Sequence, residues 1–271
     1  MGRKISYLLF FFNAVGILIS AYGQYFPSCA RIRGMAGAGV LLEDPFSGFS
    51  NPAGLAGLKN AEIAASHEMP FLINDLSVSS LSFIFPASPG VLGINGSSAG
   101  FSLWRETRAG VSFARKFGSQ FSAGIQIDGF FARVPDDIPM WPVFTWEAGL
   151  LGQPLADLLV GVHLFNPFQA DYPDTRNQRL PVSFAFGAGY RFAKKFLLAA
   201  EVEKDLLYPI AFRIGVEYQP VVNVFLRYGY NSVNGYAAGF GLRISHFNFD
   251  VAFTRHLQLG YTPSLSLGYV F

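Results

Sequence analysis

The chain has 271 residues and a formal net charge of +2 at pH 7. A balance this close to zero excludes the strongly basic surface that a nucleic-acid partner would need. Apolar residues make up 51% of the chain and charged residues only 14%, against roughly 25% charged in ordinary soluble domains. The single cysteine excludes an intrachain disulfide and a cysteine-based metal site.

Residues 1–23 have the pattern of a secretory signal peptide. Arg3 and Lys4 give a positive start, residues 7–19 are mostly apolar, and small residues before Gln24 fit a cleavage site. The alternative is a membrane anchor, but this apolar run is shorter than the roughly 20 residues of a spanning helix. We therefore expect the chain to be exported and cleaved.

Residues 24–60 are rich in glycine and alanine, which permit close backbone contacts. Asn51 and Pro52 form a helix-start signal, because Asn caps a helix and Pro fits its first turn. Since every later segment alternates like a strand, we expect this stretch to form a compact hatch, or plug, inside a closed sheet. Its candidate functional residues are Gly34, Met35, Gly37, Glu43, Asp44, Asn51, Pro52, Ala53 and Gly54.

From residue 61 to residue 271, apolar residues alternate with small or polar ones. This period of two predicts strands with two different faces. A soluble sandwich would also alternate, but its outer face would carry Lys and Glu, whereas the second face here is Gly, Ala, Ser and Asn. An apolar face turned to lipid fits better, so we predict an all-β, antiparallel transmembrane barrel of fourteen strands.

The predicted strands are bounded by turn residues, and longer connections broadly alternate with tight ones, as an even-stranded barrel requires. In the second strand the apolar phase slips between Val78 and Leu81, which predicts a β-bulge. The fourteen segments are 61–69, 76–85, 90–103, 106–115, 120–131, 142–151, 157–165, 181–192, 195–203, 209–219, 221–230, 235–245, 247–255 and 262–271.

Charged residues on the polar phase of the later strands predict a charged lumen. Two interpretations stay open: paired charges that brace the hatch, or a selectivity lining. The arginines among them are expected to pair with the two acidic residues of the hatch. The inward charges are Arg191, Glu201, Glu203, Arg213, Glu217, Arg227, Arg243 and Asp250.

Glycines recur along the third predicted strand at Gly93, Gly96 and Gly100. Glycine in a strand marks a bulge or a close approach of another backbone. The strand either packs tightly against the hatch or kinks to open the wall sideways. At the other end of the chain, the last strand carries Tyr269 and ends in Phe271, an arrangement that resembles the assembly signal of outer-membrane barrels.

The motif from Gly34 to Leu55 carries a family resemblance. Its order of Gly-Met, small residues, a short apolar run, an acidic pair and Asn-Pro-Ala-Gly-Leu resembles the N-terminal hatch of FadL-like outer-membrane barrels, and within them the PorV/PorQ branch. This resemblance implies an accessory, protein-binding role in type IX secretion or outer-membrane organisation. The FadL alternative implies a conduit for hydrophobic small molecules such as fatty acids, with an opening in the barrel wall.

No enzyme signature appears in the sequence. The four histidines lack metal-ligand spacing, and no Gly-x-Ser-x-Gly elbow occurs. We therefore expect neither catalysis nor a cofactor or metal. The expected location is the outer membrane of a Gram-negative bacterium. The expected partners are its lipid, the barrel-assembly machinery, a secretion translocon or secreted proteins, or a hydrophobic small molecule.

Overall fold

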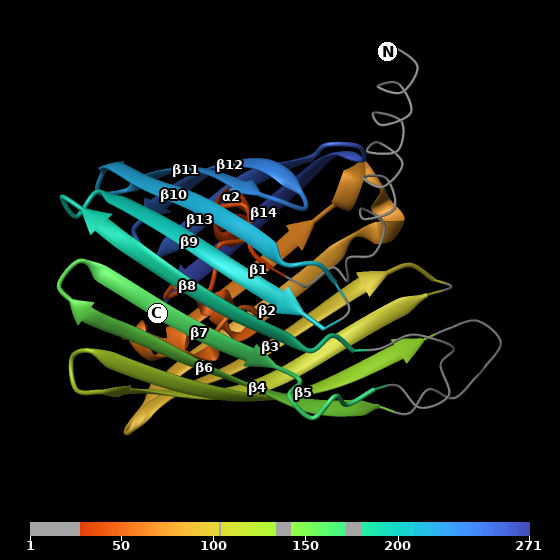
Figure 1. Ribbon diagram of the computed structural model, residues 1–271, viewed down its shortest axis with the longest axis horizontal. Coiled ribbons are helices and arrows are strands. Elements are labelled where there is room, and N and C mark those ends of the chain that lie inside the picture. The colour runs from red at the N-terminus through yellow and green to blue at the C-terminus, as the bar shows by residue number, and fades with distance from the viewer. Residues whose placement is uncertain (1–27, 103, 134–141, 172–179, 207) are drawn as a thin grey trace, which may run out of the picture.

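The computed structural model describes residues 28–271 apart from residues 103, 134–141, 172–179 and 207. The expected signal peptide thus lies outside the described residues. Fourteen strands form one closed antiparallel barrel, in which each strand pairs with its neighbours in sequence and β1 pairs with β14 (Figure 1). The strands are β1 Glu62–Glu68, β2 Val78–Ala87, β3 Gly90–Gly100, β4 Arg105–Phe117, β5 Phe121–Arg133, β6 Val143–Leu155, β7 Leu158–Phe165, β8 Ser183–Phe192, β9 Phe196–Asp205, β10 Ala211–Val221, β11 Val224–Asn231, β12 Gly235–Ile244, β13 Phe247–His256 and β14 Gly260–Val270.

The predicted barrel of fourteen strands is therefore confirmed. The predicted bulge in the second strand is wrong, because β2 pairs with both β1 and β3 without a register shift. Val78 and Ile84 lie on the inward phase, whereas Leu81, Phe83 and Phe85 face outward, so both faces of β2 carry apolar residues. Register shifts occur instead in β6 and β10, close to the turns that follow them.

The outward face is apolar, as the alternation predicts for contact with lipid. On the neighbouring strands β4 and β5, for example, Val111, Ile125 and Ile127 are each more than half exposed. No helix in the described part of the chain has the length and hydropathy needed to cross a membrane.

The two ends of the barrel differ in their connections. At one end, here called the short-turn end, Glu62 pairs with Val270, so β1 begins beside the end of β14. The turns at this end hold two or three residues. The opposite, long-loop end carries connections such as 69–77 and 166–182, the first with the 3-10 helices η3 (Pro70–Leu72) and η4 (Asn74–Leu76). In outer-membrane barrels short turns face the periplasm and long loops face outward.

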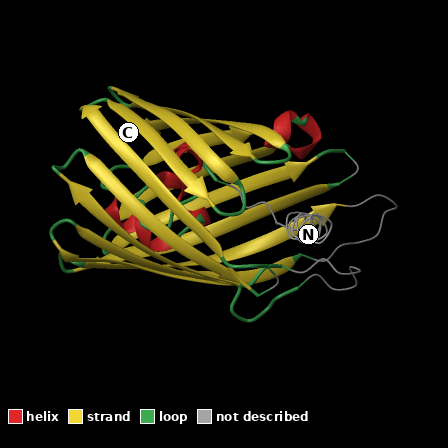
Figure 2. Cartoon of the chain, turned by 45° about the horizontal axis from the view of Figure 1, so that its top comes forward, coloured by secondary structure: helices red, strands yellow, loops and turns green. Residues whose placement is uncertain are grey.

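Residues 28–58, here called the inner segment, lie within the ring of strands (Figures 1 and 2). They form the short helix α2 (Ala30–Gly34) and the 3-10 helices η1 (Pro45–Phe49) and η2 (Pro52–Gly57). Each 3-10 helix has proline in its first turn and a side-chain cap, Asp44 for η1 and Asn51 for η2. Helix α2 contacts β11 to β14 and η2 contacts β3 to β6, so the segment spans the lumen from wall to wall.

Candidate functional site

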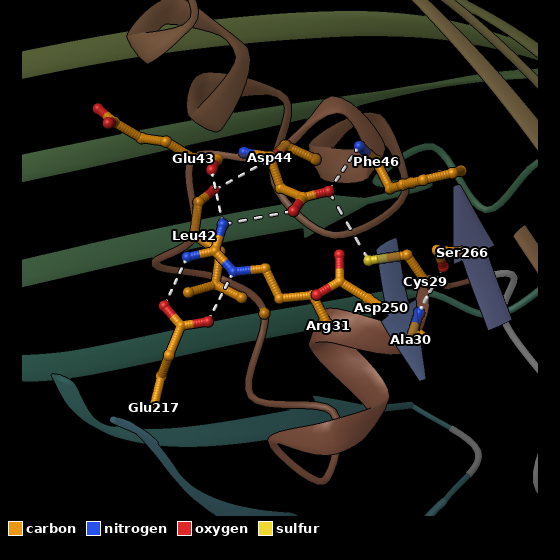
Figure 3. A network of polar contacts seen from close by, with 12 residues as sticks. Cys29, Ala30, Arg31, Leu42, Glu43, Asp44, Phe46, Glu217, Asp250 and Ser266 are labelled. Carbon is orange, nitrogen blue, oxygen red and sulfur yellow. Dashed lines mark hydrogen bonds and ion pairs between the residues drawn. The ribbon is translucent and has the colours of Figure 1, made fainter. Parts of the chain in front are cut away.

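The first half of the inner segment, residues 28–44, is tied to the barrel wall by charge. Arg31 makes two hydrogen bonds to Glu217 of β10, from Nε at 2.9 Å and from Nη2 at 2.8 Å (Figure 3). Its Nη1 donates to the Glu43 carbonyl oxygen at 3.0 Å and to Asp44 Oδ2 at 3.3 Å. Burial opposes the charge of Arg31, but Glu217 and Asp44 outweigh it and raise the pKa of the guanidinium. Arg31 thus joins the segment to β10 of the wall.

Further polar contacts follow along the same half. Arg33 Nε lies 2.9 Å from Glu68 Oε2 of β1, and the Val40 N–H donates to Glu201 Oε2 of β9 at 2.9 Å. Near the start of the segment, the Ala30 N–H donates to Ser266 Oγ of β14 at 2.8 Å (Figure 3). These contacts reach three separate strands and fix the segment against one side of the barrel.

The inward charges on β9 to β13 form ion pairs behind this half. Arg227 is buried and bonds Glu217 at 2.6 Å and Asp250 at 2.7 Å. Arg243 lies 2.9 Å from Asp250. Arg213 bonds both Glu201 and Glu203. Positive and negative side chains are paired along this part of the wall. This is the arrangement expected if the charges brace the inner segment.

The expected partners of Glu43 and Asp44 are therefore wrong. The barrel arginines are neutralised by barrel carboxylates, and Arg31 of the segment itself bonds Asp44. Asp44 Oδ1 also accepts from the Phe46 N–H at 3.0 Å and so caps η1. Glu43 points to the short-turn end, where its exposed carboxylate lies 3.4 Å from Lys116 of β4.

The second half of the inner segment, residues 45–58, is held by uncharged bonds. Ser82 Oγ donates to the Pro45 carbonyl oxygen at 2.6 Å, and Gln126 Nε2 donates to the Gly48 carbonyl oxygen at 2.7 Å. Asn51 Nδ2 donates to the carbonyl oxygens of Val40 at 2.7 Å and Leu150 at 3.2 Å. The second half is thus held by neutral hydrogen bonds to the wall, where the first half has ion pairs.

Glycines of the wall make room for this second half. A Cβ atom at Gly149 of β6 would lie 1.7 Å from Asn51 Oδ1, and one at Gly124 of β5 would lie 2.4 Å from the Pro52 carbonyl carbon. Either methyl group would force the segment to move. The close fit explains why Asn51, Pro52 and Ala53 are fully buried.

The other expected hatch residues lie along the same path. Met35 is fully buried against glycines of β10 and β11, and Gly34 meets Gly239 of β12. Gly37 has a positive φ of 89° beside Arg213. Gly54 packs inside the segment, where a side chain would collide with the Leu42 carbonyl oxygen.

A second buried charge cluster lies on β4 to β7, and the sequence analysis did not identify it. Arg108 bonds Asp128 at 2.8 Å and Glu147 at 2.6 Å, and His163 lies 2.7 Å from Glu147. Gln126 joins the cluster to Gly48 of the segment. The signal was present, because these residues occupy the inward phase of their strands.

An apolar cluster lies on the lumen side of β5 to β7, toward the long-loop end. It consists of Phe130, Val143, Phe165 and Leu180, all buried. The Arg108 guanidinium lies 5.5 Å from the Phe130 ring, 5.2 Å from the Phe165 ring and 5.3 Å from the ring of Phe49 in the segment. A buried apolar cluster therefore packs beside a charged layer and the inner segment on the inner side of the wall.

The remaining expected site residues lie in the wall. Arg191 occupies the inward phase of β8 but is exposed at the short-turn end. The strand β3 pairs with β2 and β4 without a register shift, so the wall is continuous along Gly93, Gly96 and Gly100. A Cβ atom at Gly93 would lie 2.8 Å from Leu55 of the segment, which is the close approach that glycine permits.

At the end of the chain, the Phe271 N–H donates to the Ala61 carbonyl oxygen at 2.9 Å and helps close the barrel. The Tyr269 and Phe271 rings lie 5.0 Å apart, edge to face. Within the described ranges, no group of three or more His, Cys, Asp and Glu residues is arranged to hold a metal ion.

Comparison with known proteins gives matches in structure alone. No protein-family model and no curated protein matches the chain. The toluene transporter TbuX of Ralstonia pickettii matches with a TM-score of 0.68 at 12% identity, over 90% of this chain and 98% of that one. The toluene transporter TodX of P. putida matches with a TM-score of 0.68 at 12% identity, over 92% of this chain and 99% of that one. A FadL homologue of Pseudomonas aeruginosa matches with a TM-score of 0.63 at 13% identity, over 91% of this chain and 99% of that one.

The fold is therefore similar to that of these two toluene transporters and of the FadL homologue. This architecture matches outer-membrane proteins of Gram-negative bacteria, and the similar structures are transporters rather than enzymes. At identities of 12–13% the likeness concerns the fold.

Proposed function

We propose that this protein is an outer-membrane conduit for hydrophobic small molecules, with the inner segment as its hatch. The observation that carries the proposal is the apolar cluster of Phe130, Val143, Phe165 and Leu180 on the lumen wall. The inward charges described above are paired with one another or with the inner segment, whereas barrels that pass polar solutes keep a polar, water-filled interior. An apolar lining next to a segment that fills the lumen suits cargo that avoids water.

The similar structures support the same class of cargo. TbuX and TodX are toluene transporters, and a TodX variant of the same fold is a monoaromatic hydrocarbon channel. Nothing in these comparisons supports an accessory role in type IX secretion, which the PorV/PorQ resemblance suggested. The conduit is therefore the function we put forward.

The proposal extends to the location and assembly of the chain. Export by an N-terminal signal peptide would deliver it to the outer membrane, and Tyr269 and Phe271 would serve the assembly machinery as the recognised end of the last strand. The paired inward charges would brace the hatch. The continuous β3 ladder supports a route through the lumen rather than through the wall at the glycines of β3.

Uptake of labelled toluene into cells that lack other such transporters tests the conduit. We expect the protein to raise toluene uptake and to leave uptake of a polar sugar of similar size unchanged. Phe130→Ala removes an aromatic ring from the lumen cluster, so the half-saturating toluene concentration should rise about tenfold, equivalent to about 1.4 kcal/mol. Its matched control is Phe131→Ala, because Phe131 is the next residue and faces outward. Equal uptake of sugar and toluene, or equal effects of the two variants, would contradict the conduit.

A further inference from the structure

Two arginines stand directly opposite each other on the outward face of the barrel, at its long-loop end. Arg105 begins β4 and Arg133 ends β5, and the two residues are cross-strand partners in the antiparallel register. Each lies in phase with an outward apolar residue of its own strand, Val111 or Ile127, and both arginines are exposed. Directly opposed residues have Cβ atoms about 4.5–5.5 Å apart, so both guanidinium groups project from one place on the wall.

This pair has no anionic partner in the described part of the chain. Neither side chain forms an ion pair, a hydrogen bond or a ring contact there. Like charges directly opposite each other destabilise a sheet. Arg108, three residues along β4, shows the contrast, because it faces the lumen and bonds both Asp128 and Glu147. An anion from outside the chain is therefore what would relieve the repulsion between Arg105 and Arg133.

The position of the pair relative to the membrane follows from the length of β4. The outward residues between Arg105 and Arg115 are Thr107, Ala109, Val111 and Phe113, none of them charged. Ten residues of strand cover about 33 Å at roughly 3.3 Å per residue. A strand tilted by about 40° rises about 25 Å over that length, which is the height of the apolar band of an outer-membrane barrel. The two arginine positions of β4 thus mark the two edges of the band, and the Arg105–Arg133 pair lies at the level of the lipid headgroups.

We propose that Arg105 and Arg133 together bind a phosphate group of the phosphorylated glycolipid in the outer leaflet of the outer membrane. Long loops face outward in such barrels, so the pair meets the outer leaflet. Guanidinium groups bind phosphate oxygens through paired hydrogen bonds, and two of them hold one phosphate from both sides. Phe131, on the same face of β5 and 45% exposed, lies against the acyl chains. The inference goes beyond transport and rests only on the proposed outer-membrane location.

Native mass spectrometry of the full-length protein in detergent compares the candidate lipids directly. The protein is offered diphosphoryl lipid A, the same lipid A with its phosphates removed, and phosphatidylglycerol, at equal concentrations. We expect diphosphoryl lipid A to be retained about fivefold or more over either of the others, the upper range of an exposed ion pair. Inorganic phosphate in excess should not displace it, because the acyl chains add apolar contact that the free ion lacks.

Substitutions of the two arginines locate the site. Arg105→Gln and Arg133→Gln should each lower the retention of lipid A about threefold or more, and the double variant should lose the preference for the phosphorylated form. Arg133→Lys keeps the charge without the paired hydrogen bonds and should give an intermediate loss. Arg255→Gln is the matched control. Arg255 is exposed on the outward phase of β13 near the long-loop end, but Tyr236 and Tyr261 lie opposite it rather than a second arginine.

Several outcomes would overturn the proposal. Equal retention of lipid A with and without its phosphates would do so, as would an equal loss in the Arg255→Gln control. Equal or stronger retention of phosphatidylglycerol would define a glycerophospholipid site instead, and displacement by inorganic phosphate would define a site for the free ion.

The conduit is tested separately, because the pair lies outside the lumen. We expect Arg105→Gln to lose lipid A retention while toluene uptake stays at the level of the parent protein. Lipid A retention without toluene uptake defeats the conduit alone, whereas toluene uptake without a preference for phosphorylated lipid A defeats this inference alone.

Discussion

The two halves of the inner segment are held in place by different interactions. Residues 28–44 use Arg31, Arg33 and a backbone N–H to reach carboxylates on three strands. Residues 45–58 use neutral hydrogen bonds and the room left by wall glycines, with bonds from Ser82 and Gln126 to their carbonyl oxygens. The first half should therefore respond to the loss of a charge, and the second half to the addition of a methyl group.

The difference bears on how a hatch could open. A buried ion pair is costly to break when one partner remains without compensation, but charged groups regain hydration if the segment moves into water. The close packing of residues 45–58 against the wall glycines involves no charge, so a change in charge does not weaken it directly. The charged half is thus the one that a change in charge can release, and the shape-fitted half is the one that holds its place.

A native reporter for the charged half is already present. Cys29 is 2% exposed, and its Sγ lies 3.7 Å from Asp44 Oδ1 (Figure 3). Burial raises the pKa of the Cys29 thiol, and the neighbouring Asp44 carboxylate raises it further. A thiol that is buried and protonated reacts slowly with maleimide. Its labelling rate therefore measures how often residues 28–44 leave the wall.

The largest effect is expected from Glu217→Gln. This change removes the carboxylate that Arg31 and Arg227 share, so Arg31 keeps Asp44 alone and Arg227 keeps Asp250 alone, at a cost of about 3 kcal/mol, the lower end for a broken buried pair. We expect maleimide labelling of Cys29 to accelerate more than tenfold while the barrel remains folded on a heat-modifiability gel. The control is Glu203→Gln, because Glu203 bonds Arg213 of the wall rather than Arg31 of the segment. Unchanged labelling in Glu217→Gln would show that charge does not hold this half.

Gly149→Ala is expected to have the next largest effect, on the other half. The added Cβ would lie 1.7 Å from Asn51 Oδ1, and overpacking of this kind costs about 1–3 kcal/mol. We expect faster proteolysis at residues 45–58 in purified protein and a smaller rise in Cys29 labelling, because the displaced Asn51 also bonds Val40 of the first half. Gly96→Ala is the matched control, since a Cβ there meets only the Arg108 carbonyl oxygen at 3.6 Å. If both variants behave alike, the shape fit at Gly149 is unimportant.

A smaller effect is expected from Asn51→Ala, which lies where the halves meet. Asn51 caps η2 through the Ala53 N–H at 3.1 Å and joins Val40 of the first half to Leu150 of the wall. Loss of a cap costs about 1 kcal/mol. Both readouts, Cys29 labelling and proteolysis at 45–58, should rise two- to fivefold together. A change in one readout alone would mean that Asn51 does not couple the halves.

The sequence predicts the barrel well because the alternation of apolar and polar residues is visible within each strand by itself. The period of two continues through β8 to β14, and the observed ends of these strands lie within a few residues of those predicted. The false bulge at Val78 has a physical explanation: Val78 and Ile84 are apolar but face inward, while other apolar residues of β2 face outward, so the phase appeared to slip.

The lumen was harder to predict because ion pairs depend on three-dimensional neighbours. The charges of β9 to β13 stand on the inward phase, yet their partners could not be chosen from phase alone. Arg31 and Arg33 precede the glycine-rich motif and were not considered as partners for the wall carboxylates. Arg108, Asp128 and Glu147 also occupy the inward phase, and their pairing depends on the alignment of β4 with β5 and β6.

The central claim is that hydrophobic cargo passes when the inner segment moves, and a reversible bridge tests it most directly. The Ala30 N–H of the segment donates to Ser266 Oγ of β14 at 2.8 Å, so these two residues lie in contact (Figure 3). In the triple variant Cys29→Ser, Ala30→Cys, Ser266→Cys, a disulfide would fix the segment to β14. We predict that toluene uptake falls to background when the bridge forms and returns on reduction, with Cys29→Ser alone unaffected. Uptake that continues at the full rate with the bridge formed would contradict the account.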